Sequence, residues 1–227
     1  MIVHKKNVST MRQTFTKSYS ILLLLISSLW SVPAYCTDIE TLDRLLASKN
    51  INVQALKSMG PAIMPNLVTL YKKGNSTRRA TIAWVWYKLA WKSPAAREAM
   101  LADMDTTHKT LRLQIQWAIG HVSNDTEVVH ILLDKLMNDP NPLFSEKAAC
   151  ALASDQIHLN DFQRVELLDG LISGMESDSP QVRDFSIRAM QIQTGQRKQY
   201  NANAPAGERA QQVRIWRQWL NEYKSNL

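Results

Sequence analysis

An apolar stripe that returns behind a fixed anchor position is the strongest constraint on the fold. The anchors are Arg79, Arg112, Ser145 and Arg183, which are spaced by 33, 33 and 38 residues. Apolar or small residues follow each anchor at offsets of three, six and seven, and these offsets share one side of a helix at about 100° per residue. The last interval is longer because the segment SDQIHLNDFQ (154–163) intervenes. The pattern predicts a repeated helical unit.

A second helix-like segment with a polar turn at its end precedes each anchor helix. Prolines at positions 61, 94, 142 and 180 fit the first turn of a helix, where the missing N–H removes no hydrogen bond. The composition agrees, because the 227 residues include only seven glycines and 45% are hydrophobic. We therefore expect a unit of helix, short turn and helix.

The segment LLDGLISGMESDSPQVRDFSIRAM (167–190) resembles a HEAT repeat, in which an Asp-containing turn joins two helices and leads into Val-Arg. Asp178 and Arg183 match that pattern closely, whereas Asp105 and Arg112 match it loosely. Ser145 departs from the pattern, and Asn75 stands where an aspartate would precede Arg79. The resemblance covers residues 61–195, with a less regular helical pair at 38–58 in front.

This resemblance implies an all-α fold, a right-handed α-solenoid of about four to five HEAT-like helical hairpins. In the family, the turn aspartate and the helix arginine link neighbouring repeats. Four residues are expected to belong to such a structural ladder: Arg79, Arg112, Asp178 and Arg183.

The last segment of the chain breaks the period. A loop over about 195–206 leads into a helix with one apolar face formed by Val213, Trp216, Leu220 and Tyr223. An end repeat exposes its core side unless something covers it. We therefore assign residues 37–195 to the repeat array and 196–227 to a loop and a C-terminal capping helix.

Residues 1–36 have the order of a secretory signal peptide. Four basic residues precede the apolar run ILLLLISSLW (21–30), small residues follow it, and no acidic residue occurs before Asp38. A ten-residue run is too short to span a bilayer. We expect cleavage after Ala34 or after Cys36, a periplasmic or secreted chain, and no membrane insertion once the leader is removed.

The charge balance argues against a nucleic-acid partner. The leader holds four of the 27 basic residues and none of the 20 acidic residues, so the net charge falls from +7 to +3 when it is removed. A small positive excess without a long basic run is weak support for nucleic-acid binding.

No catalytic or metal-binding motif stands out. The four histidines after the leader (His108, His121, His130 and His158) include no pair at a spacing of three or four residues, and no HExxH, Gly-rich phosphate loop or GxSxG occurs. We expect no catalytic residue, metal or cofactor. Cys150 lies in EKAACALA, which is typical of a small buried hydrophobic residue.

Large aromatic residues lie opposite the predicted core stripe. Trp84, Tyr87 and Trp91 fall at offsets 5, 8 and 12 from Arg79, and Trp117 falls at offset 5 from Arg112. The HEAT resemblance implies that the second helix of each unit lines a concave surface. These rings then form either an aromatic binding strip, with Lys88 and Lys92 at its edge, or packing between adjacent repeats.

These features predict an exported, non-enzymatic scaffold that binds a protein or peptide partner on its concave helical face. An immunity protein or an adaptor is a narrower version of the same prediction. The alternatives are a protein that binds a glycan or cell-wall fragment, since tryptophans stack on sugar rings, and a HEAT-like enzyme with no recognisable motif.

Overall fold

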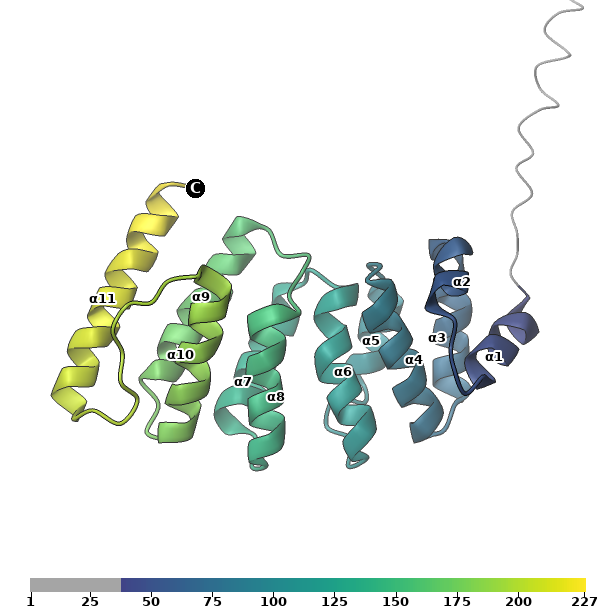
Figure 1. Ribbon diagram of the computed structural model, residues 1–227, viewed down its shortest axis with the longest axis horizontal. Helices are drawn as coiled ribbons and strands as arrows, with labels where there is room; N and C mark the ends of the chain where they lie inside the picture. Colours follow the sequence, from purple (N-terminus) through teal and green to yellow (C-terminus); the bar gives the residue numbers. More distant parts are fainter. Residues whose placement is uncertain (1–37) are drawn as a thin grey trace, which may run out of the picture. The chain divides into compact units, whose positions relative to one another are not determined.

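The computed structural model describes residues 38–227, which belong to one compact unit spanning Thr37–Leu227. The expected leader and its cleavage site lie outside the described residues. Within 38–227 the regular elements are eleven α-helices and one short 3-10 helix, with no strand (Figure 1). The prediction of an all-α fold is confirmed.

The helices follow one another in sequence as pairs joined by short turns. In chain order, with the 3-10 helix Pro61–Ile63 leading into α3, they are α1 (Ile39–Ala47) and α2 (Val53–Ser58), α3 (Met64–Lys73) and α4 (Ser76–Leu89), α5 (Pro94–Leu101) and α6 (Lys109–Val122), α7 (Thr126–Asn138) and α8 (Pro142–Ser154), α9 (Asp161–Met175) and α10 (Pro180–Thr194), and finally α11 (Ala206–Ser225).

Side-chain caps and prolines fix where the helices begin. Pro94, Pro142 and Pro180 each occupy the first position of a helix, as predicted, while Pro61 starts the 3-10 helix before α3. Asn75 caps α4 by accepting the N–H of Arg78 at 2.9 Å. These caps satisfy backbone donors that have no partner inside the helix.

The second helices of the pairs pack against one another in chain order. α4 lies against α6, α6 against α8 and α8 against α10, and Figure 1 shows α4, α6 and α8 side by side. Ile82, Trp86, Ile115 and Ile119, which occupy offsets three and seven, are fully buried between these helices and their partners. This apolar burial is the main stabilising contribution of the fold.

The C-terminal helix covers one side of α9. α11 packs against α9, and Val213, Trp216 and Leu220 of its apolar face are buried. Tyr223, the fourth residue of that face, is half-buried and stacks on Trp219 at 5.6 Å between ring centroids. The end of the helical array is thereby shielded from water.

One expected helix is shorter than the periodicity indicated. α4 ends at Leu89, because Ala90 adopts a left-handed conformation with φ of 57°. Trp91 lies beyond this cap, so the helical phase that placed it opposite the core does not determine its direction. His158, in the turn before α9, donates its Nε2–H to the carbonyls of Ala90 and His121 at 3.1 and 3.0 Å.

Candidate functional site

The recurring arginine at position 79 is held by groups from two neighbouring hairpins. Its guanidinium lies 3.1 Å from Asp103, in the turn after α5, and its Nε donates to the carbonyl of Gly74 at 2.9 Å. The same carboxylate accepts the phenolic O–H of Tyr71 at 2.8 Å. Burial, and then this hydrogen bond to Asp103, raise the pKa of Tyr71. Arg79 thus connects the α3–α4 hairpin to the α5–α6 hairpin.

Arg112 makes an equivalent connection one hairpin further along. It forms an ion pair with the buried carboxylate of Asp139, which lies just before α8, and a longer one of 3.4 Å with Asp105 of its own hairpin. Its guanidinium carbon also lies 4.0 Å from the ring centre of Phe144. Because these carboxylates neutralise its charge, Arg112 is not available to bind an anionic ligand.

Arg183 binds carbonyl groups instead of carboxylates. Its Nη1 donates to the carbonyls of Ser177 and Asp178 at 2.8 Å, and its Nε donates to the carbonyl of Ala202 at 2.7 Å. The side chain of Asp178 is exposed and forms no ion pair within residues 38–227. At the anchor position without an arginine, the hydroxyl of Ser145 donates to the carbonyl of Leu136 at 2.6 Å.

The aromatic residues opposite the core stripe are half-buried. Trp84, Tyr87 and Trp91 pack at the edge of the core, and Trp117 has the same intermediate exposure on α6. Tyr87 stacks on His121 with 4.2 Å between ring centroids, and His121 contacts Asp155 at 3.2 Å. The rings therefore contribute packing and still present surface to solvent.

Lys88 extends over this aromatic cluster. Its ammonium lies 5.8 Å from the ring centre of Trp84 and 5.0 Å from that of Tyr87. Such cation–π contacts are weak at exposed sites. The side chain is exposed and has no ion-pair partner among residues 38–227. Its charge is thus available to a ligand.

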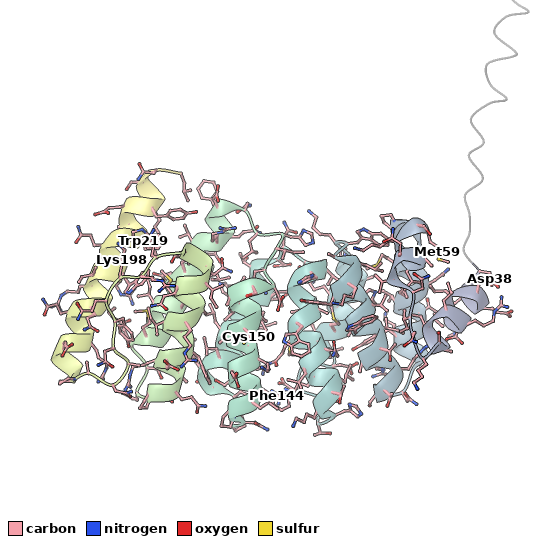
Figure 2. All side chains as sticks on the ribbon, in the orientation of Figure 1. Asp38, Met59, Phe144, Cys150, Lys198 and Trp219 are labelled. Carbon is pink, nitrogen blue, oxygen red and sulfur yellow. The ribbon has the colours of Figure 1, made fainter. Side chains whose placement is uncertain are left out.

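Residues five positions after the anchors define one surface, which we call the second-helix face. These residues are Trp84 on α4, Trp117 on α6, Cys150 on α8 and Arg188 on α10. The expectation that Cys150 is buried is wrong, because its side chain is exposed; Figure 2 shows it further along α8 than Phe144. Contact with apolar neighbours still raises the pKa of its thiol.

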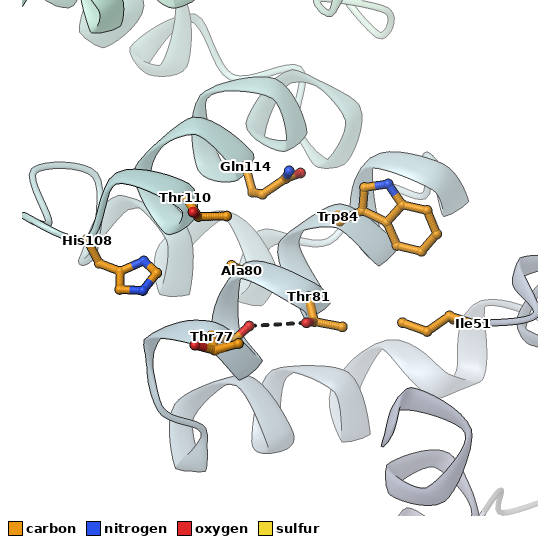
Figure 3. A pocket seen from close by; sticks show the side chains of 8 residues that line it. All are labelled: Ile51, Thr77, Ala80, Thr81, Trp84, His108, Thr110 and Gln114. Atoms are coloured by element: carbon orange, nitrogen blue, oxygen red, sulfur yellow. Dashed lines mark hydrogen bonds between the residues drawn. The ribbon is translucent and has the colours of Figure 1, made fainter. Parts of the chain in front are cut away.

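A hollow of about 440 Å³ lies between α4 and α6 on the second-helix face (Figure 3). Figure 3 shows Gln114 of α6 extending toward Trp84 of α4, with Ile51 on the far side. The Oε1 atom of Gln114 is buried and has no hydrogen-bond partner in this part of the chain. The complete lining is Ile51, Thr77, Ala80, Thr81, Trp84, His108, Thr110 and Gln114.

A smaller hollow of about 130 Å³ lies between α8 and α10 on the same face. Its walls include Cys150, Phe185 and Ile192, and Ile192 is 61% exposed. Sequence reasoning missed both hollows, because they form between helices of successive hairpins. Cys150 lies at the same offset from its anchor as Trp84 and Trp117 do from theirs. Its position on this face was therefore predictable from the sequence pattern.

Metal-binding chemistry has no candidate within residues 38–227. No group of three or more His, Cys, Asp or Glu side chains in that range is arranged to hold a metal ion. None of the helices described is both long and apolar enough to cross a membrane. The second-helix face is the candidate functional surface, because it combines half-exposed rings, two hollows and the exposed ammonium of Lys88.

Comparisons with known proteins add no relative to this description. No family model, no curated protein and no solved structure matches the chain.

Proposed function

We propose that this chain is an exported, non-enzymatic binding scaffold that docks a protein or peptide partner on its second-helix face. In this proposal the helical pairs form a right-handed HEAT-like α-solenoid with α11 as its cap, and the second-helix face is the concave side. A periplasmic or secreted location follows from the leader-like residues 1–36. Immunity and adaptor roles both fit such a scaffold.

The observation that carries the proposal is the position of Trp84 and Trp117. The two rings occupy the same offset on adjacent helices and remain half-exposed, although Trp86 and Ile119 of the same helices are fully buried. Tryptophan is among the residues most enriched at binding hot spots, because a large rigid ring buries much area at little entropic cost. Repetition on consecutive helices extends this surface across the face.

The arginines support a binding role and not a catalytic one. Arg79, Arg112 and Arg183 are each held by carboxylates or carbonyls of the scaffold. Their function in the proposal is to fix the spacing of successive hairpins. The surface groups left for a partner are then the aromatic rings, the lysines and the apolar side chains that line the hollows.

Capture of the partner from living cells tests the proposal. The protein is crosslinked in the cells that produce it, and the captured species are identified by mass spectrometry. Trp84→Ala and Trp117→Ala are expected to abolish capture. Because each ring is half-buried, the same changes should lower the free energy of unfolding by about 1–3 kcal/mol, less than for a fully buried aromatic residue.

Trp219→Ala is the matched control. Trp219 is also half-buried and stacks on Tyr223, but it lies on α11, away from the second-helix face. We expect it to lose stability to a similar degree and to retain capture. Equal loss of capture in all three variants would show that folding, and not docking, explains the effect. Retained capture in the Trp84 and Trp117 variants would place the docking surface elsewhere.

A further inference from the structure

The helices that border the larger hollow have an unusual charge pattern. α4 and α6 contain no aspartate or glutamate, but together they hold three arginines and two lysines. The arginines are already neutralised, because Arg78 pairs with Asp43, Arg79 with Asp103 and Arg112 with Asp139 and Asp105. The two lysines, Lys88 and Lys109, pair with no carboxylate among residues 38–227.

These two lysines lie next to the lining of the hollow. Lys88 reaches over the ring of Trp84, and Lys109 follows His108 and precedes Thr110, which both belong to the lining. Both side chains are exposed. No acidic residue lines the hollow. A ligand that enters it therefore meets positive charge without compensating carboxylates, which favours an acidic ligand.

The lining of the hollow also favours a ligand that carries an apolar group and hydrogen-bonding groups. Ile51, Ala80 and Trp84 provide apolar surface that an aliphatic or aromatic side chain can cover. The side-chain amide of Gln114 adds a polar group to the lining, with which a ligand can form a hydrogen bond. Backbone amides of an extended peptide supply N–H groups at regular intervals.

We propose that the hollow between α4 and α6 binds an acidic peptide segment of the partner, with an apolar side chain inserted beside Trp84 and flanking carboxylates near Lys88 and Lys109. The side-chain amide of Gln114 forms a hydrogen bond with the peptide backbone. An acidic polysaccharide provides carboxylates and hydroxyl donors, but its rings lack an apolar branch for the space beside Ile51 and Ala80. The proposal rests on the proposed scaffold function and specifies the chemistry of its partner.

Selection from a phage-displayed library of random 12-residue peptides tests this inference. The purified protein is immobilised at an ionic strength of about 0.15 M, where exposed charges farther apart than about 8 Å are largely screened. We expect the enriched peptides to carry net negative charge and at least one large apolar residue. The double variant Lys88→Glu/Lys109→Glu should bind the enriched peptides at least about tenfold more weakly, and Trp84→Phe should retain part of the affinity.

Arg214→Glu/Lys224→Glu is the matched control, because both side chains are exposed on α11, which packs against α9, and neither has an ion-pair partner among residues 38–227. It should change affinity less than about twofold, as expected for remote exposed charges. Enriched peptides that are neutral or basic, or an equal loss in both double variants, would overturn the inference. So would binding of polygalacturonate oligomers that depends on Lys88 and Lys109 when no peptide is selected.

Cellular capture separates this inference from the scaffold proposal. If Lys88→Glu/Lys109→Glu still captures the partner and Trp84→Ala does not, the scaffold proposal stands and the acidic-peptide inference fails. If neither the unaltered protein nor any variant captures a partner through the second-helix face, the scaffold proposal fails, whatever peptides are selected.

Discussion

At the scale of single residues, Tyr71 couples the stability of the protein to alkaline pH. Its ring is buried against Trp86, with 5.0 Å between centroids, and its O–H donates to Asp103. Burial is the main cause that raises the pKa of this phenol, followed by the bond to Asp103. The folded state therefore keeps the proton at a pH where an unfolded tyrosine, with a pKa of about 10, releases it.

The difference between the pKa of Tyr71 in the folded and in the unfolded state sets the sign of the pH dependence of stability. The contribution of Tyr71 to stability is complete below pH of about 10 and declines above it, by up to about 1.4 kcal/mol per pH unit. Tyr71→Phe should cost about 1 kcal/mol at pH 8, through the lost hydrogen bond, and should flatten the decline between pH 9.5 and 11. Urea unfolding at several pH values measures both effects, and parallel curves for the two proteins would contradict this interpretation.

Arg183 is a buried, charged residue that binds backbone carbonyls of its own scaffold, and we expect it to stabilise the fold and not to bind a ligand. It is 4% exposed and donates to three backbone carbonyls. Arg183→Met should lower the free energy of unfolding by about 3 kcal/mol, because those acceptors lose their donors.

Arg188→Met, in the same helix, is the comparison for that measurement. The Arg188 side chain is 69% exposed and pairs with Asp184 at 2.8 Å across one turn. Its loss should cost no more than about 0.5 kcal/mol. Thermal melts that rank the two variants equally would show that the Arg183 contacts do not stabilise the turn before α10.

At the scale of helices, the close approach of α6 to the turn after α8 depends on a glycine. A Cβ added to Gly120 would lie 2.3 Å from the carbonyl oxygen of Asp155, which is backbone and cannot rotate away. Gly120→Ala should therefore destabilise the protein by about 2 kcal/mol or more. Gly207→Ala, in the first turn of α11 with open space around it, should be neutral or slightly stabilising. Chemical unfolding of both variants tests the contrast.

The elements also show how far the sequence determines the structure. Apolar periodicity, polar turns and first-turn prolines predicted a helical chain, because these signals are local. The end of α4 was missed, because no glycine or proline marks it and alanine rarely adopts a left-handed cap. The Arg112–Asp139 pair and the hollow beside Trp84 were not predictable, since both depend on how successive hairpins tilt against each other.

At the scale of the molecule, three arginines and two lysines of the described residues have different surroundings. Arg79 and Arg112 pair with carboxylates of the next turn and connect successive hairpins, and Arg183 connects α10 to the loop before α11. Lys88 and Lys109 have no ion-pair partner among residues 38–227, and Lys88 lies over the half-exposed rings of Trp84 and Tyr87. In our account the arginines fix the spacing of the scaffold and the lysines contribute to binding the partner.

Site-specific photo-crosslinking in cells tests that account most directly. A photoreactive amino acid is placed at Lys88, at Cys150 or at His130, whose side chain is 63% exposed on α7, a first helix of a pair. The account predicts that the Lys88 and Cys150 probes capture one and the same protein and that the His130 probe captures none. Capture at His130 alone, or no capture at either position of the second-helix face, would contradict it.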